Sequence, residues 1–207
     1  MKIIDISWPI ARYMTTYKDK HEVLLHQTEK EDVDFSRESV ISFNTHTGTH
    51  VDAPSHFLKD GNTIDAIDLK QLIGECTVID CTTVEGKITE SDLHGFDIKQ
   101  NDIVLLKTKN SQLPTDAPFD FNFVYVDESA AQFLVGKKIK AVGIDYLGIE
   151  REQLQHETHK LFMKHDIPII EGLRFEGVIP KRYQFYCLPL KIIGLEAAPA
   201  RAILIED

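Results

Sequence analysis

Short apolar segments recur along the chain, and most of them predict β-strands. They are rich in β-branched or aromatic side chains and are bounded by residues that favour turns. The predicted strands are Lys2–Ile6, Val40–Thr45, Thr77–Cys81, Ile103–Lys107, Phe123–Val126, Ala141–Ile144, Pro168–Ile170 and Ala202–Ile205.

Helical periodicity is less common, and its clearest instance is Arg151–Lys164, where Leu154, Leu161 and Phe162 recur at helical spacing. Shorter helices are predicted over Ile67–Leu72, Thr89–Leu93 and Glu128–Leu134. Many strands with interspersed helices predict an α/β fold, built on one sheet or on a mixed sheet closed into a barrel with helices packed outside. A length of 207 residues favours one domain over residues 1–207.

Charge and cysteine content narrow the class of protein. Acidic residues outnumber basic ones by 33 to 23, and the net charge of −10 argues against binding to nucleic acid or to an anionic membrane. The three cysteines form no CxxC pattern, so we expect buried thiols rather than disulfides or a zinc–thiolate site. The charged segment 26–39 is predicted as a solvated loop. The chain shows no secretory signal and no apolar run of ~18 residues, which predicts a cytoplasmic protein.

Histidines are concentrated in one segment, HTGTHVDAPSHF, which holds three of the nine in the chain. A strand through residues 41–52 places alternate side chains on opposite faces. His46, His50 and Asp52 then project from one face, and Gly48 leaves room for an ion between the histidines. Two imidazoles and a carboxylate without a thiolate are typical ligands of Zn²⁺, Mn²⁺ or Fe²⁺.

The end of the same segment offers a group for acid–base chemistry. Pro54 is expected to turn the chain, because proline cannot donate to a central strand ladder, and the turn brings His56 over the ligands. Three protein ligands on one strand leave coordination positions open, as in catalytic metal sites. His56 need not be a ligand, so the residues alone leave two roles open: a further metal ligand, or a general acid/base beside metal-bound water.

The segment HTGTHVDAPSHF resembles the signature of the cyclase family of metal-dependent hydrolases, which includes bacterial kynurenine formamidase and isatin hydrolase. Elsewhere, IDISWPI is similar to the family's opening strand, HKLFMKHDIPIIEGL to its second motif, and GLEAAPARAILIE to its closing strand. The resemblance covers nearly the whole chain. It implies a barrel of the swivelling β/β/α type, and a homodimer or homotetramer with pockets completed near the subunit interface.

Carried over residue by residue, the resemblance implies that His46, His50 and Asp52 bind a divalent ion, Zn²⁺ or Mn²⁺. His56 matches the family's general acid/base. Asp52 is expected to bridge to a second ion, so that each subunit holds one or two ions.

The second motif implies two further metal ligands, His159 and Glu171. His159 is expected to bind the second ion, and Glu171 to contact one or both ions. His156 lies three residues before His159 on a similar helical face, so the residues alone leave it as an alternative ligand.

The sequence departs from kynurenine formamidases where those enzymes line the substrate pocket. They carry a Trp-Pro-Gly stretch soon after the opening strand, whereas this chain has TTYKDK, which places Tyr17 there. The one tryptophan, Trp8, falls in the opening segment instead. Tyr17 is therefore predicted to contact the substrate, and the substrate is less closely defined than the metal chemistry.

These observations predict a metal-dependent hydrolase that cleaves a carbon–nitrogen bond of a small amide or cyclic amide. A divalent ion lowers the pKa of bound water from ~15.7 towards ~7, and His56 is expected to carry a proton from water to the leaving nitrogen. Arylformamidase, which converts N-formylkynurenine to kynurenine and formate in tryptophan catabolism, is the best specific candidate. The alternatives are hydrolysis of another small lactam or ester, and a non-catalytic metal-binding or sensor protein.

Overall fold

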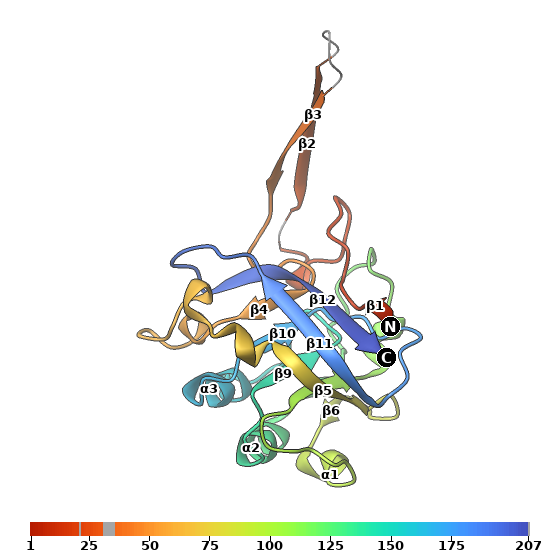
Figure 1. The fold of residues 1–207 in the computed structure, drawn as a ribbon, viewed down its shortest axis with the longest axis vertical. Helices are drawn as coiled ribbons and strands as arrows, with labels where there is room; N and C mark the ends of the chain where they lie inside the picture. Colours follow the sequence, from red (N-terminus) through yellow and green to blue (C-terminus); the bar gives the residue numbers. More distant parts are fainter. Residues whose placement is uncertain (21, 31–35, 207) are drawn as a thin grey trace.

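A mixed β-barrel forms the body of the protein (Figure 1). The computed structural model describes residues 1–20, 22–30 and 36–206. Within these residues, seven strands close in the order β12-β11-β5-β7-β9-β10-β4, and β4 pairs back onto β12. The strands are β4 (His50–Asp52), β5 (Ile73–Asp80), β7 (Ile103–Lys107), β9 (Ala141–Ile144), β10 (Ile169–Glu171), β11 (Arg182–Pro189) and β12 (Ala197–Glu206). The predicted α/β fold with a closed mixed sheet is confirmed.

Strand direction changes around the barrel. β5, β7, β9 and β10 run parallel to their neighbours in that series, whereas β4, β11 and β12 pair antiparallel. β1 (Lys2–Asp5) joins the far end of β12, with Lys2 opposite Glu206. β7 and β9 coincide residue for residue with their predictions, because a short apolar run between turn residues is typical of a parallel strand buried on both faces.

Two apolar cores lie on either side of the sheet. Ile103 and Leu105 of β7 point into the barrel, where they join a cluster that includes Phe185. Val104 and Leu106 point outward into a second cluster, which the helices cover. The helices α1 (Glu90–Leu93), α2 (Glu128–Gly136) and α3 (Glu157–Lys164) lie along one side of the barrel (Figure 1).

Local capping explains where two helices begin. Thr89 and Asp92 form a capping box at the start of α1. The Asp127 side chain accepts the backbone N–H of Ala130 at the start of α2. None of the helices formed by the described residues has the length and apolar character needed to cross a membrane. The remaining short elements are β6 (Lys87–Ile88), β8 (Tyr125–Val126) and the 3₁₀ turns η1 (Tyr17–Asp19), η2 (Pro54–His56), η3 (Ile64–Ala66), η4 (Leu69–Gln71) and η5 (Lys109–Gln112).

Two helix predictions need correction. The helix predicted over Arg151–Lys164 begins only at Glu157, because Glu152 and His156 have left-handed φ angles of 57° and 54° that interrupt helical geometry. The helix predicted over Ile67–Leu72 is a single 3₁₀ turn, η4.

The loop prediction for residues 26–39 is also wrong. β2 (Leu24–Lys30) pairs antiparallel with β3 (Ser36–Ser42), and this hairpin projects from the barrel (Figure 1). Its charged and polar residues are compatible with strands because every residue of β3 is exposed. Residues 31–35 lie outside the described part of the chain. The strand predicted over Val40–Thr45 corresponds only to the last part of β3.

Candidate metal centre

Three of the predicted ligands meet where β4 pairs with β10. Glu171 lies directly opposite His50 in this antiparallel pair. Val51 and Ile170 point into the barrel core, so His50, Asp52 and Glu171 point to the opposite face. The His50 Nε2 atom lies 3.4 Å from Asp52 Oδ1 and 3.4 Å from Glu171 Oε2. One atom from each of these residues lies within 4.8 Å of the others.

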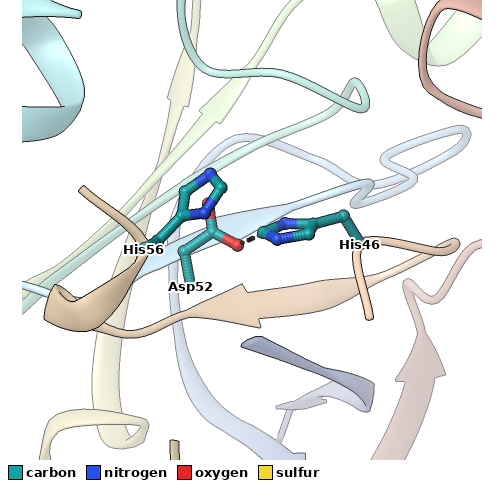
Figure 2. A group of neighbouring side chains, drawn as sticks. All are labelled: His46, Asp52 and His56. Carbon is teal, nitrogen blue, oxygen red and sulfur yellow. Dashed lines mark ion pairs between the residues drawn. The ribbon is translucent and has the colours of Figure 1, made fainter. Parts of the chain in front are cut away.

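His46 and His56 approach Asp52 from other segments (Figure 2). His46 lies in the turn before β4, and its Nδ1 atom is 2.9 Å from Asp52 Oδ1. His56 ends the η2 turn that begins at Pro54, and its ring centroid is 4.3 Å from that of His46. Asp52 therefore belongs to two groups of ligand-type atoms, one with His50 and Glu171 and the other with His46 and His56.

Helix α3 brings His159 to the same cluster. His159 is buried, and its Nε2 atom lies 3.4 Å from Glu171 Oε1 and 3.7 Å from Asp52 Oδ2. The alternative ligand, His156, directs its Nδ1 atom to the Glu150 carboxylate instead. His156 has a left-handed backbone, yet one atom each from Glu150, His156 and His159 lies within 4.8 Å of the others, so these residues form a further group of ligand-type atoms beside the Asp52 cluster.

The prediction of a continuous strand through residues 41–52 is wrong, and glycine geometry gives the reason. Gly48 has a φ of +62°, and a Cβ there would lie 3.1 Å from the Trp8 carbonyl oxygen. Gly48 therefore serves a tight turn rather than leaving room for an ion. A Cβ on Gly172, whose φ is +69°, would lie only 2.3 Å from the Gly48 carbonyl oxygen. These glycines let the turn containing His46 pack against the end of β10.

Hydrogen bonds fix the orientation of two ligand-type side chains. His50 Nδ1 lies 2.9 Å from the Gly48 carbonyl oxygen. Because only a protonated nitrogen can donate to a carbonyl, Nδ1 carries a proton in this contact, and Nε2 is the ring nitrogen that faces the carboxylates. The backbone N–H of Ile149 donates to Glu171 Oε1 over 2.6 Å.

The buried carboxylates are ionised and surrounded by imidazoles. Burial disfavours a charged Asp52, but His46, His159 and His50 outweigh it and hold the Asp52 pKa well below its usual value. Burial and Asp52 both oppose ionisation of Glu171, whereas His159 and His50 lower its pKa to about 2. Burial likewise opposes charging of His46, but the Asp52 carboxylate raises the His46 pKa to about 9. A cation is therefore strongly favoured at this cluster.

The residues fit a divalent metal ion. His50 Nε2 and both carboxylate oxygens of Asp52 are buried without an aligned hydrogen-bond partner among the described residues. Such atoms are costly to bury unless they are satisfied by an ion or water. The nitrogen and oxygen donors suit Zn²⁺ or Mn²⁺. The three cysteines are free and buried, as predicted, and contribute no thiolate to the cluster.

A cavity of about 320 Å³ opens onto the cluster. Its size is at the lower end of the range for small-molecule sites, ~300–1,000 Å³. Tyr17 lies on its wall, half-buried, with its ring 5.3 Å from that of Phe119. Burial lowers the pKa of His56 below its usual value, so His56 presents a neutral imidazole to the cavity at pH 7. The lining consists of Tyr17, Lys18, Asn44, His46, His56, Phe57, Leu147, Gly148, Glu150, His156, His159 and Glu171.

A second, larger cavity of about 630 Å³ includes Lys107 and Arg174 in its lining. The positively charged side chains in this lining already donate hydrogen bonds to backbone carbonyl oxygens. The Arg174 guanidinium donates to the carbonyl oxygens of Ser111 and Leu113, and Lys107 Nζ donates to that of Val178. This cavity contains none of the clustered histidines, so the smaller cavity is the candidate for chemistry.

Two acidic residues at the cluster were not predicted from the sequence. Glu196 Oε1 lies 3.4 Å from His46 Nε2 and accepts a hydrogen bond from the Thr45 hydroxyl. Glu150 contacts both His156 and His159. Neither acid has a short, regular spacing to its histidine partner that a sequence pattern could reveal.

The closed α/β barrel places a buried cluster of histidines and carboxylates at a cavity. This arrangement is the one expected of a metal-dependent hydrolase. Residues 4–151 match the family model described as "Putative cyclase", which is more than half of the chain. The chain therefore belongs to the cyclase family, and the resemblance noted from its motifs is confirmed.

Similarity extends to curated proteins and to a solved structure. The chain is 37% identical over 171 residues to cyclase-like protein 3 of Oryza sativa subsp. japonica, covering 78% of this chain and 63% of that protein. It therefore spans less than two thirds of the rice protein's length. It is 35% identical over 167 residues to kynurenine formamidase of Erythrobacter litoralis, covering 80% and 76% of the two chains. The structure of a predicted metal-dependent hydrolase from Bacillus stearothermophilus superposes with a TM-score of 0.85 at 43% identity, covering 98% and 97%.

Proposed function

We propose that this protein is a metal-dependent hydrolase that cleaves a carbon–nitrogen bond of a small amide or cyclic amide. Within that class, arylformamidase action on N-formylkynurenine is the specific activity that we propose. The similarity to a protein named kynurenine formamidase supports this choice. The observation that carries the proposal is the position of His56, a neutral imidazole that lines the cavity beside the Asp52 cluster.

In this proposal one set of residues would hold the metal ion, and His56 would move a proton. His46, His50, Asp52, His159 and Glu171 would hold one or two divalent ions. When bound, such an ion supplies Lewis acidity that polarises a carbonyl and makes water more acidic. His56 takes a proton from the attacking water and delivers it to the departing nitrogen, so that an amide and water give an acid and an amine.

The cavity wall provides the substrate contacts. The Tyr17 side chain is half-buried in the cavity wall, where it offers an aromatic ring and a polar hydroxyl. Phe57 adds a second ring next to His56, at a centroid distance of 4.3 Å. Aromatic walls of this kind favour a planar aryl group in the substrate.

A substrate panel tests the proposed function. Purified protein is stripped with a chelator, reloaded with Zn²⁺ or Mn²⁺, and assayed on N-formylkynurenine, formanilides, a cyclic amide such as isatin, and aryl esters. We expect activity that requires added metal and is highest on an aryl formamide. Metal-loaded protein that is inert on every member of the panel would favour a metal-binding or sensor role instead.

We also propose that the protein assembles as a homodimer or homotetramer through the β2–β3 hairpin. A two-stranded sheet alone is marginally stable in water. Leu24 and Val40 lie on the same face of this hairpin and are 56% and 69% exposed, which leaves an apolar surface for a second copy. Sedimentation velocity of wild type and of Val40→Asp tests this, since the substitution should shift the protein towards monomer. An unchanged sedimentation coefficient would contradict a hairpin interface.

A further inference from the structure

Glu150 is a buried carboxylate outside the predicted ligand set, and three nitrogen atoms surround it. It lies in the segment between β9 and α3 and is only 6% exposed. His156 Nδ1 contacts Oε1. The backbone N–H of His159 donates to Oε2 over 3.1 Å, and His159 Nδ1 lies 3.1 Å from the same oxygen.

The two ring nitrogens of His159 face different carboxylates. Nδ1 is directed to Glu150, whereas Nε2 is directed to Glu171 and Asp52 at 3.4 and 3.7 Å. His159 Nδ1 is buried without an aligned hydrogen-bond partner among the described residues, and the Glu150 carboxylate lies 3.1 Å away as an acceptor for an N–H at this atom. A proton on Nδ1 leaves the Nε2 lone pair free for a metal.

His156 holds the carboxylate from the other side. Its side chain is 49% exposed, and its left-handed backbone, with a φ of 54°, turns the imidazole back towards Glu150. Phe57 packs against both histidines, with its ring 4.5 Å from that of His156 and 4.7 Å from that of His159. The carboxylate is therefore fixed by His156 and by the helix start rather than by the metal cluster.

We propose that Glu150 is a positioning residue of the metal centre, and that His156 is its anchor. Glu150 keeps the proton of His159 on Nδ1 and aims Nε2 at the space beside Asp52 and Glu171. Glu150 belongs to a group of ligand-type atoms with His156 and His159, and we assign it to positioning because both of its carboxylate oxygens are taken up by contacts with these two residues. This inference rests on the metal centre that the proposed function requires.

Metal affinity provides the first test. The Zn²⁺ dissociation constant of metal-free wild type, Glu150→Gln and Glu150→Ala is measured by competition with a chromophoric chelator. Loss of a carboxylate behind a ligating histidine typically weakens metal binding ~10–100-fold, and we expect a change of that size in both variants. Glu152→Gln is the matched control, because Glu152 lies two residues away, is exposed, and loses the same charge. The control should bind Zn²⁺ as wild type does.

A spectroscopic measurement distinguishes a positioning role of Glu150 from a merely structural one. In Zn²⁺-loaded wild type, long-range ¹H–¹⁵N correlation of the histidine rings should show His159 protonated on Nδ1 and metal-bound through Nε2. In Glu150→Ala that pattern should be lost or mixed with the opposite tautomer. If Glu150→Ala is too unstable to study, His156→Ala leaves the carboxylate in place without its anchor and should weaken Zn²⁺ binding by a smaller factor.

Two outcomes overturn the inference. Wild-type Zn²⁺ affinity in Glu150→Ala would show that the carboxylate has no positioning role, and Zn²⁺ bound to Nδ1 of His159 in wild type would reverse the assigned tautomer. Failure of the proposed function looks different. Wild type would then bind Zn²⁺ with the expected dependence on Glu150 but hydrolyse no amide.

Discussion

Glu171 faces His50 across the β4–β10 pair, and the two side chains approach to 3.4 Å although they are distant in the sequence. β4 is also the strand that closes the barrel, because it pairs with β12 on its other edge. The metal cluster is therefore assembled by barrel closure. An ion held by side chains from β4, β10 and α3 would join these elements, so metal binding and folding should be thermodynamically linked.

Replacing His56 with alanine should remove catalysis while leaving metal binding intact. We expect kcat to fall by ~10²–10⁴, the usual contribution of a general acid/base, because the proposed role of His56 is to move the proton rather than to bind the ion. Steady-state kinetics and Zn²⁺ titration of His56→Ala check both parts. His94→Ala, at the exposed end of α1 and away from the cavity lining, is the control and should retain full activity. A large loss of Zn²⁺ affinity in His56→Ala would identify His56 as a ligand.

Substituting Gly172 should destabilise the fold more than substituting another glycine of similar backbone geometry. Gly172 and Gly177 have φ angles of +69° and +70°, but only Gly172 lacks room for a Cβ. The left-handed backbone costs alanine ~1–2 kcal/mol at either position, and the overlap with Gly48 adds ~1–3 kcal/mol at Gly172. Urea unfolding of Gly172→Ala and Gly177→Ala measures the difference. Equal destabilisation would contradict the close approach of β10 to the Gly48 turn.

Removing the Tyr17 ring should weaken substrate binding more than removing its hydroxyl. Tyr17→Ala deletes an aromatic wall of the cavity, and a loss of ~1–1.5 kcal/mol of ring contact corresponds to a roughly tenfold rise in KM. Tyr17→Phe keeps the ring and should stay within about twofold of wild type. Kinetics on the best substrate of the panel provide the measurement. If Tyr17→Ala and wild type share the same KM, Tyr17 does not contact the substrate.

The three thiols should be inert in the folded protein at pH 8. Burial raises the pKa of Cys76 and Cys81 to about 12, and burial also raises that of Cys187. A pKa raised to that value leaves roughly one thiol in ten thousand as the reactive thiolate at pH 8. A chromogenic disulfide reagent should therefore report no prompt reaction with native protein and three equivalents after denaturation. Prompt labelling of the native protein would contradict this burial.

The sequence predicts the parts of this fold whose stability comes from local pattern. β7 and β9 are continuous apolar runs, and both were predicted with correct ends. β11 was missed, although its buried Tyr183, Phe185 and Cys187 alternate with more exposed residues. Most of the β2–β3 hairpin was missed for a physical reason. Apart from Leu24, Leu25, Val40 and Ile41 its residues are polar, and every residue of β3 is exposed, so the hairpin has no buried face that a hydrophobic pattern can reveal.

The residues of the candidate site show the same difference between those that a local sequence pattern predicts and those that only the fold brings together. His46, His50, Asp52 and His56 lie in one short motif, so their types and spacing indicate chemistry directly. Glu150 acts across a turn whose left-handed residue, His156, no periodicity predicts. Glu196 reaches His46 only through the closure of the barrel. Groups that depend on tertiary contacts in this way become visible only in the folded structure.

Metal binding by Asp52→Asn tests the central claim most directly, because Asp52 is shared by two of the three groups of ligand-type atoms found among the described residues. Metal-free wild type and the variant are titrated with Zn²⁺ and with Mn²⁺ by isothermal calorimetry, with elemental analysis of the loaded proteins. The account predicts one or two tightly bound ions per chain in wild type and loss of tight binding in Asp52→Asn. Equal stoichiometry and equal affinity in the two proteins would contradict a metal centre built around Asp52.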